Sequence, residues 1–313
     1  MIKYTKTLAV ITLVAFAAFF NSCKGKKTIS ISGAFALHPL AVKWSQEYMK
    51  LHPEIKIDVS SGGTGKGISD VLSGNAEIGM VSREINPAET EKGAWPLAVS
   101  KDAVVATVNT SNPYIKTILE KGIKKEGFEA VWITGKAKQW SDIISDSSAT
   151  NHVQIYKRSD AAGAPEVWAK YLGKKQEDLL GVGVFGDPGL ADAVKKDPNG
   201  IGFNNLAFVY NISTKKPYEG LLPVPIDVNN NGTIDSTENF YGSMDLIIEA
   251  INKGAYPSPP ARDLYFITKG KPTDPAVTEF LKWVLTDGQQ YVEQSGYVKL
   301  PDSQLQPEIN KLK

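Results

Sequence analysis

The alternation of short β-branched runs with amphipathic segments restricts the fold of this chain more than any other feature. The runs "TISISG" (28–33), "IKIDVS" (55–60) and "AEIGMVS" (76–82) have the composition of strands. Between them, "HPLAVKWSQEYMKLHP" (38–53) and "GISDVLSG" (67–74) have the apolar spacing of helices. Because strand–helix–strand alternation connects parallel strands, this pattern predicts an α/β fold with helices on both faces of its sheets.

The same alternation of predicted strands and helices returns later in the chain. "DAVVATVN" (102–109) reads as a buried strand, and residues 110–152 mix helices with loops. Further strands are predicted at "VQIYK" (153–157), "GIGFNN" (200–205), "LLPVPIDV" (221–228) and "DLYFITKG" (263–270). Residues 275–296 predict one amphipathic helix stopped by Gly296.

The length of the chain indicates two domains. Its 313 residues exceed the size at which a single core usually stops growing, yet no Gly/Ser linker separates two halves. We therefore expect the chain to cross between domains on strands, near 102–109 and 263–270. Lobe 1 would comprise 23–108 and 262–313, and lobe 2 (109–261) would be inserted between them.

The first residues predict a leader rather than part of the fold. Lys3 and Lys6 precede an apolar run at 8–20 that is short for a membrane span but suits a secretion signal. Cys23, the only cysteine, follows this run directly. We expect a lipoprotein signal peptide at 1–22 and a lipidated Cys23, hence a membrane-anchored protein of the cell envelope that faces the periplasm or the exterior.

Charge and side-chain chemistry exclude two classes of function. The net charge is +1, which does not suit binding to nucleic-acid phosphates. His38, His52 and His152 are scattered, and no nucleophile has a suitable partner nearby in the sequence. The sequence therefore predicts a monomeric protein that is not an enzyme.

Three Gly-containing loops precede predicted helices: "SGAFALHP" (32–39), "SSGGTGKGI" (60–68) and "RSDAAGAPEVW" (158–168). The first turn of a helix leaves N–H groups unpaired and carries a positive partial charge. One such loop is commonplace, since small residues also cap helices where no ligand binds. Three that converge on a cleft would form an anion-binding site.

These loops carry a resemblance to a known family. Together with "KDAVVATVNTSNP", "KQWSDI" and "LYFITKGKP", they follow one another as in PstS-like phosphate-binding proteins of ABC transporters, over nearly the whole chain after the leader. The resemblance implies a two-lobed periplasmic-binding-protein type II fold, in which each lobe is a mixed sheet flanked by helices. It also implies that the lobes close on a tetrahedral oxyanion and deliver it to a permease pair with its ATPase.

The resemblance assigns ligand-binding residues. They are Ala34, Phe35, Ala36, Thr64, Gly65, Ser82, Arg158, Asp160, Ala162, Gly163 and Ala164.

These positions depart from the family in their hydroxyl groups. Thr64 matches a ligand hydroxyl, and Ser82 stands where some members have an aspartate that accepts a proton from phosphate. Arg158 and Asp160 match the family's ion pair. In the first and third loops alanines replace hydroxyl residues, so only backbone N–H groups remain there. Since each hydrogen bond to a charged group contributes about 1.5–3 kcal/mol, we expect weaker phosphate binding unless other donors replace them.

Two alternatives remain open at this point. Phe35 and the alanines also suit a site retuned to another anion, such as a larger or organic one. A phosphatase relative would need a nucleophile beside Arg158, and the local hydroxyls are those of Ser159, Thr64 and Ser82.

One metal motif stands apart from this pattern. "DVNNNGTIDSTE" (227–238) meets the calcium-loop pattern D-x-[DN]-x-[DN]-G-x₅-E. Its predicted ligands are Asp227, Asn229, Asn231, Thr233, Asp235 and Glu238. Because the preceding residues are extended rather than helical, we expect a structural calcium site of weak affinity and not a switch. The alternative is a hairpin rich in ordinary turn residues.

Overall fold

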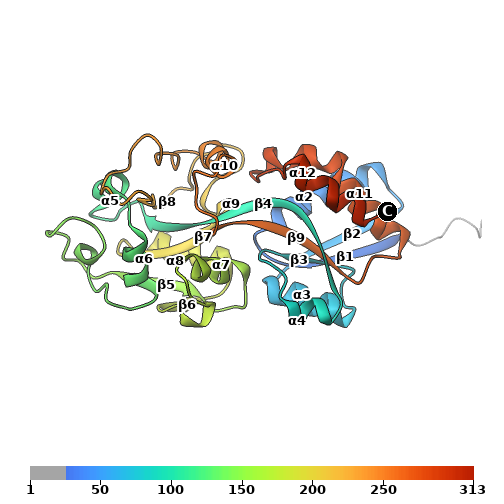
Figure 1. Ribbon diagram of the computed structural model, residues 1–313, viewed down its shortest axis with the longest axis horizontal. Coiled ribbons are helices and arrows are strands. Elements are labelled where there is room, and N and C mark those ends of the chain that lie inside the picture. Colours follow the sequence, from blue (N-terminus) through green and yellow to red (C-terminus); the bar gives the residue numbers. More distant parts are fainter. Residues whose placement is uncertain (1–25) are drawn as a thin grey trace, which may run out of the picture.

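A computed structural model describes residues 26–313, so the predicted signal peptide and Cys23 lie outside the described residues. Two lobes lie end to end and are joined by the long strands β4 (Ala94–Asn109) and β9 (Ala261–Lys269) (Figure 1). Within residues 26–313 no helix combines the length and the apolar character that crossing a membrane requires.

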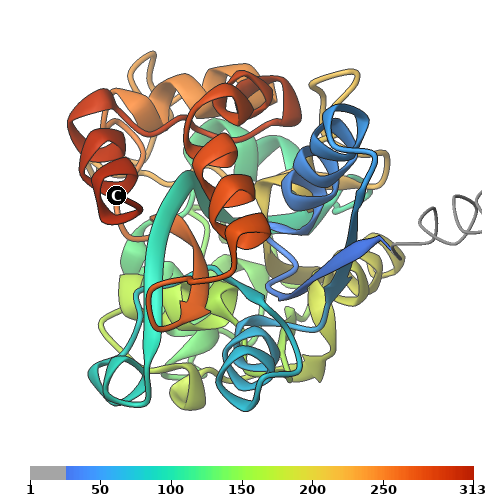
Figure 2. The ribbon, with the colours of Figure 1, turned by 90° about the vertical axis from the view of Figure 1, so that its right-hand side faces the viewer.

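Lobe 1 is a mixed sheet between two layers of helices. Its strand order is β2-β1-β3-β9-β4; β1 is parallel to β2 and β3, whereas β9 is antiparallel to β3 and β4. Helices α2, α11 and α12 cover one face and α3 and α4 the other (Figure 1, Figure 2). The elements are β1 (Lys27–Gly33), α2 (His38–Leu51), β2 (Ile55–Ser61), α3 (Thr64–Ser73), β3 (Ile78–Val81), α4 (Pro87–Glu91), α11 (Pro275–Leu285) and α12 (Asp302–Lys311).

Lobe 2 continues the same sheet beyond β4, in the order β4-β7-β5-β6, with β8 also paired to β4. Strand β5 is parallel to β6 and β7, whereas β7 is antiparallel to β4. The strands are β5 (Gln154–Arg158), β6 (Val182–Val184), β7 (Gly200–Asn205) and β8 (Leu221–Pro223). The helices are α5 (Ile115–Lys121), α6 (Lys125–Trp132), α7 (Gly163–Tyr171), α8 (Gly186–Lys196), α9 (Leu206–Val209) and α10 (Met244–Asn252). The predicted mixed sheets and flanking helices are confirmed in both lobes.

Strand β4 belongs to both lobes because it changes partner along its length. Its first part, from Ala94 to Ala103, pairs with β9, and its second part, from Val104 to Val108, pairs with β7. One continuous backbone therefore links the parts of the sheet that belong to the two lobes, and any movement of one lobe against the other bends β4 and β9.

Each lobe has its own aromatic core. In lobe 1 the rings of Trp44 and Phe266 lie 5.6 Å apart, centroid to centroid. In lobe 2 Trp168 packs against Trp132 at 5.4 Å and against Phe203 at 5.7 Å.

Two sequence-based predictions of secondary structure were wrong in extent. The helix predicted over 275–296 ends at Leu285, and 3₁₀ turns follow at Asp287–Tyr291 and Glu293–Ser295. The chain turns there so closely that a Cβ on Gly288 would lie 2.9 Å from the carbonyl oxygen of Trp283. The strand predicted over 221–228 is confined to β8, because two prolines, Pro223 and Pro225, lack the N–H that continued pairing needs.

Candidate functional site

The three glycine-containing loops meet between the lobes. Gly33, at the end of β1, accepts hydrogen bonds through its carbonyl oxygen from the N–H groups of Gly62 and Gly63, at 2.9 and 3.0 Å. Gly63 has φ +92°, a backbone conformation that favours glycine and lets α3 begin at Thr64. The first two loops therefore form one surface of lobe 1.

The third loop, from lobe 2, touches this surface directly. The N–H of Gly65 donates to the carbonyl oxygen of Ala161 at 3.2 Å. Gly163 lies so close to Ser82 that an added Cβ would be 2.2 Å from the Ser82 carbonyl oxygen and 2.3 Å from its Oγ. The structure therefore has the lobes closed over the predicted site.

The helices that begin here offer backbone donors. None of α2, α3 and α7 has a side-chain hydrogen bond capping its first turn. Not every predicted amide is available in the closed arrangement, because the N–H of Ala34 donates to the Met80 carbonyl oxygen at 2.9 Å and that of Gly65 is bonded to Ala161. The uncapped helix starts nevertheless make this a region of positive partial charge.

Arg158 is the most tightly held charge of the site. Its side chain is 1% exposed; Nε and Nη2 donate to the two carboxylate oxygens of Asp160 at 2.7 and 2.5 Å. Its Nη1 donates to Asp187, a buried residue in the first turn of α8 that sequence reasoning missed. Burial lowers the pKa of Arg158, but Asp187 and Asp160 outweigh it and hold that pKa above its usual value. Since a guanidinium has five N–H groups, two remain for a ligand.

The signal for Asp187 was present in the sequence. "GVFGDPG" (183–189) is another short strand followed by a glycine and a helix start, like the three loops described above.

The carboxylate of Asp160 is held ionised by its arginine partner. Burial raises the pKa of Asp160, yet the Arg158 guanidinium outweighs this effect and lowers that pKa. Arg158 is thus shared by two carboxylates, which leaves less net positive charge than the predicted pair alone.

Phe35 covers the guanidinium from lobe 1. The centre of the Arg158 guanidinium lies 5.5 Å from the centroid of the Phe35 ring, and the Phe185 ring meets Phe35 edge-on at 6.1 Å. Such a cation–π contact stabilises the arginine and excludes water from it. Ala34 and Ala36, on either side of Phe35, are buried, so their methyl groups replace hydroxyls in a dry environment.

Thr64 and Ser82 form the hydroxyl pair of the site. The Ser82 N–H donates to Thr64 Oγ1 at 3.1 Å, and the two hydroxyl oxygens lie 3.2 Å apart. Both residues are almost fully buried. They are therefore placed to present hydroxyls beside the start of α7, where Ala162, Gly163 and Ala164 contribute no hydroxyl of their own.

A second group of buried charges lies on the strands that join the lobes. Arg262 of β9 donates through Nη2 to Asn205 and lies 3.5 Å from Asp102 of β4. Its Nε and Nη1 have no hydrogen-bond partner among residues 26–313. Burial raises the pKa of Asp102 to about 6, against the opposing effect of Arg262. Sequence reasoning missed this group because its residues are far apart in the chain.

The buried Asp102 should make the free energy of unfolding depend on pH. Because its folded pKa exceeds the ordinary value of 3.8, its contribution to stability is largest below about pH 4 and is lost as the pH rises through about 6. The Asp102→Asn variant should therefore gain about 3 kcal/mol relative to the natural protein between pH 4 and pH 7. Urea unfolding across this range measures the effect, with the exposed Asp58→Asn variant as control; parallel pH profiles of Asp102→Asn and the natural protein would contradict it.

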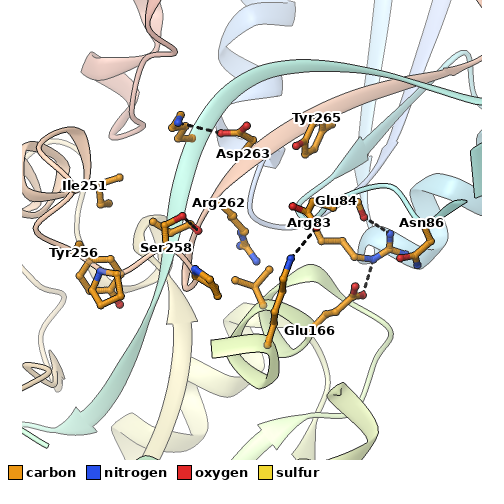
Figure 3. Close-up of a pocket in the computed structure, with 17 residues that line it drawn as sticks. Arg83, Glu84, Asn86, Glu166, Ile251, Tyr256, Ser258, Arg262, Asp263 and Tyr265 are labelled. Atoms are coloured by element: carbon orange, nitrogen blue, oxygen red, sulfur yellow. Dashed lines mark hydrogen bonds and ion pairs between the residues drawn. The ribbon is translucent and has the colours of Figure 1, made fainter. Parts of the chain in front are cut away.

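Ion pairs join the lobes beside this group. Arg83 of lobe 1 pairs with Glu166 of α7 at 2.7 Å, and Lys170 of α7 pairs with Glu84 at 2.8 Å (Figure 3). These residues and Arg262 line a cavity of about 510 Å³ between the lobes. The closed arrangement is thus held by charge pairs as well as by the loops.

The predicted calcium loop is remote from this site. It lies in lobe 2 and packs against the turn between α5 and α6, where Ile234 N–H donates to the Glu120 carbonyl oxygen at 2.8 Å. Any ion bound there would have no direct contact with a ligand held between the lobes.

Two lobes that close over uncapped helix starts and a buried arginine define a binding protein of the two-lobed type. A family model described as a PBP superfamily domain matches residues 21–288. This chain belongs to the PBP superfamily.

Among curated proteins, the chain is similar to the phosphate-binding protein PstS of Pseudomonas aeruginosa PAO1, with 27% identity over 91% of this chain and 86% of that protein. It is also similar to PstS of Methanocaldococcus jannaschii, with 26% identity over 83% of this chain and 79% of that protein. Both are binding proteins by name, in agreement with the prediction that this chain is not an enzyme.

Solved structures show the same fold. A phosphate ABC transporter substrate-binding protein with bound phosphate from Clostridium perfringens superposes with a TM-score of 0.70 at 20% identity, over 88% of this chain and all of that chain. An ABC-type phosphate transport receptor from Vibrio cholerae gives a TM-score of 0.62 at 17% identity, over 87% of this chain and all of that chain. The predicted two-lobed fold is confirmed.

Proposed function

We propose that this protein captures phosphate between its lobes and delivers it to an ABC transporter. The observation that carries the proposal is the meeting of three uncapped helix starts with the buried Arg158. The similar proteins named as phosphate-binding support the same ligand. The partners would be a permease pair and its ATPase, and the protein would work outside the cytoplasm as a monomer anchored through a lipid on Cys23.

The donors would act together. Arg158 would give its two remaining N–H groups, and Thr64 and Ser82 their hydroxyls. The loop before α2 and the first turns of α3 and α7 would give those backbone amides that are not already bonded within the protein. Asp160 would hold the guanidinium in place. Because the anion would lose its water on closure, every one of these donors would matter more than at an exposed surface.

A retuned site is the second candidate. The alanines at 34, 36, 162 and 164 remove hydroxyls, while Asp187 adds a second carboxylate to Arg158. Both changes weaken the attraction for a small, highly charged anion. They favour an anion with lower charge density or with an apolar part that packs on Phe35.

Calorimetric titration distinguishes these candidates. The folded protein would be titrated with phosphate, arsenate and sulfate, and separately with an organic phosphate ester and a carboxylate. Binding of inorganic phosphate at micromolar concentration supports the first proposal. If inorganic oxyanions fail at millimolar concentration while an organic anion binds, the retuned site replaces it.

Thr64→Val tests the hydroxyl contact. Valine has nearly the same shape, so the variant removes the hydroxyl that would bond the charged ligand and should cost about 1.5–3 kcal/mol, or about 10- to 150-fold in phosphate affinity. It also removes the acceptor of the Ser82 N–H, so the unfolding free energy would be measured alongside the affinity. Thr28→Val, on the exposed start of β1, is the control. An unchanged dissociation constant would show that Thr64 does not contact the ligand.

A further inference from the structure

The loop 227–238 is folded around its first carboxylate. Asp227 is 1% exposed, and its two carboxylate oxygens accept hydrogen bonds from the N–H groups of Asn231 at 3.1 Å and Gly232 at 2.8 Å. Gly232 has φ +79°, which favours glycine at this sharp turn. The loop therefore bends back so that the backbone of Asn231 and Gly232 faces Asp227.

Glu238, the last residue of the motif, points into the same loop. It is 4% exposed, and its Oε1 accepts hydrogen bonds from the N–H groups of Val228 at 2.8 Å and Asn229 at 3.0 Å. Its other oxygen, Oε2, is buried and has no hydrogen-bond partner among residues 26–313. A buried carboxylate oxygen without a partner is costly, and a cation inside the loop would satisfy it.

The charges of the loop are not balanced by protein groups. Asp227, Asp235 and Glu238 give the loop a formal charge of −3. Among the ion pairs of residues 26–313, the one that reaches these carboxylates comes from Lys124, whose Nζ is 4.0 Å from Asp227 Oδ2. Lys124 is half exposed and is also bonded to the Asn230 carbonyl oxygen at 2.8 Å. Two negative charges therefore remain, which a divalent cation would neutralise.

The available ligands are oxygens of mixed kind. Among residues 26–313 no three carboxylate, imidazole or thiol groups gather into a metal site. An ion here would therefore rely also on neutral oxygens, from the side chains of Asn229 and Asn231 and the backbone of Thr233. Hard oxygen ligands of this mixture suit calcium, whereas zinc and other transition metals prefer nitrogen or sulfur.

We propose that residues 227–238 bind calcium and that the ion stabilises the end of lobe 2 that lies farthest from lobe 1. The loop holds the turn between α5 and α6: Asp227 N–H donates to the Ile123 carbonyl oxygen at 3.2 Å, and the Ile234 side chain covers Gly122. This end of lobe 2 is the one farthest from lobe 1 (Figure 1). The calcium site would thus stabilise the fold of lobe 2 and take no part in ligand binding between the lobes.

The test uses the mature protein stripped of metal with a chelator. Calorimetry should show one calcium bound per chain, with a dissociation constant on the order of 10⁻⁴–10⁻³ M, as for extracellular modules of this type. Calcium at ten to a hundred times this constant should raise the melting temperature by several degrees, whereas equal magnesium should do much less. Phosphate affinity should stay the same with and without calcium.

Glu238→Gln and Asp235→Asn should each weaken calcium binding at least tenfold and remove most of the rise in melting temperature. The control is Glu219→Gln, an exposed carboxylate of lobe 2 outside the loop, which should respond like the natural protein. If the stripped protein is folded by circular dichroism but neither binds calcium nor melts later with it, the proposal is wrong. It is equally wrong if both loop variants retain the natural response; should Glu238→Gln fail to fold, Asp235→Asn decides, because Asp235 is less buried than Glu238.

Discussion

Replacing Arg158 by alanine should strongly weaken phosphate binding and also destabilise lobe 2. The guanidinium would supply two hydrogen bonds to the anion, so its loss should weaken binding about 10²–10⁴-fold. The same change leaves Asp160 and Asp187 buried without a counter-charge, since their side chains are 8% and 1% exposed. Breaking a buried pair in this way costs about 3–5 kcal/mol of unfolding free energy.

The two effects are separable by neutralising the carboxylates. A triple variant, Arg158→Met with Asp160→Asn and Asp187→Asn, removes the charges together and should recover much of the lost stability but none of the binding. Chemical denaturation and phosphate titration of both variants would be compared with the natural protein. Phosphate binding by the folded triple variant at natural affinity would show that Arg158 does not hold the anion.

Gly163→Ala should weaken ligand binding while leaving the unfolding free energy unchanged or higher. In the closed structure the new methyl group would lie 2.2 Å from the Ser82 carbonyl oxygen, so the lobes could not approach as closely. Gly163 is the first residue of α7, however, where the helical backbone accepts alanine at least as well as glycine. The variant should therefore lose phosphate affinity by at least tenfold without losing stability, an effect that a folding defect does not produce.

Gly189→Ala is the matched control for this variant. Gly189 is also a helical glycine of lobe 2, and an added Cβ there would meet only the Val184 side chain, at 3.1 Å. Small-angle scattering would follow closure: phosphate should make the natural protein and Gly189→Ala more compact, and Gly163→Ala less so. Full closure and natural affinity in Gly163→Ala would mean that the contact with Ser82 is not part of the ligand-bound state.

Much of this protein is determined by local sequence. The alternating strands and helices predicted the α/β class, and the three loops at 32–39, 60–68 and 158–168 each open a helix in the structure. These features depend on residues within one turn or one strand, so they can be predicted from a short stretch of sequence. Arg158 and Asp160 belong here too, because residues two apart at the end of a strand need no long-range contact to pair.

The tertiary structure alone decides which residues contact one another in the site. Asp187 reaches Arg158 because β5 and β6 are parallel neighbours, and Asp102 meets Arg262 because β4 and β9 cross between the lobes side by side. Gly163 of lobe 2 meets Ser82 of lobe 1 across the boundary between the lobes. Strand order and closure bring together residues 18 to 160 positions apart, and no local propensity encodes such pairings. The sequence by itself therefore determined which segments present donors. The strand order within lobe 2 decided that two buried carboxylates share the Arg158 guanidinium.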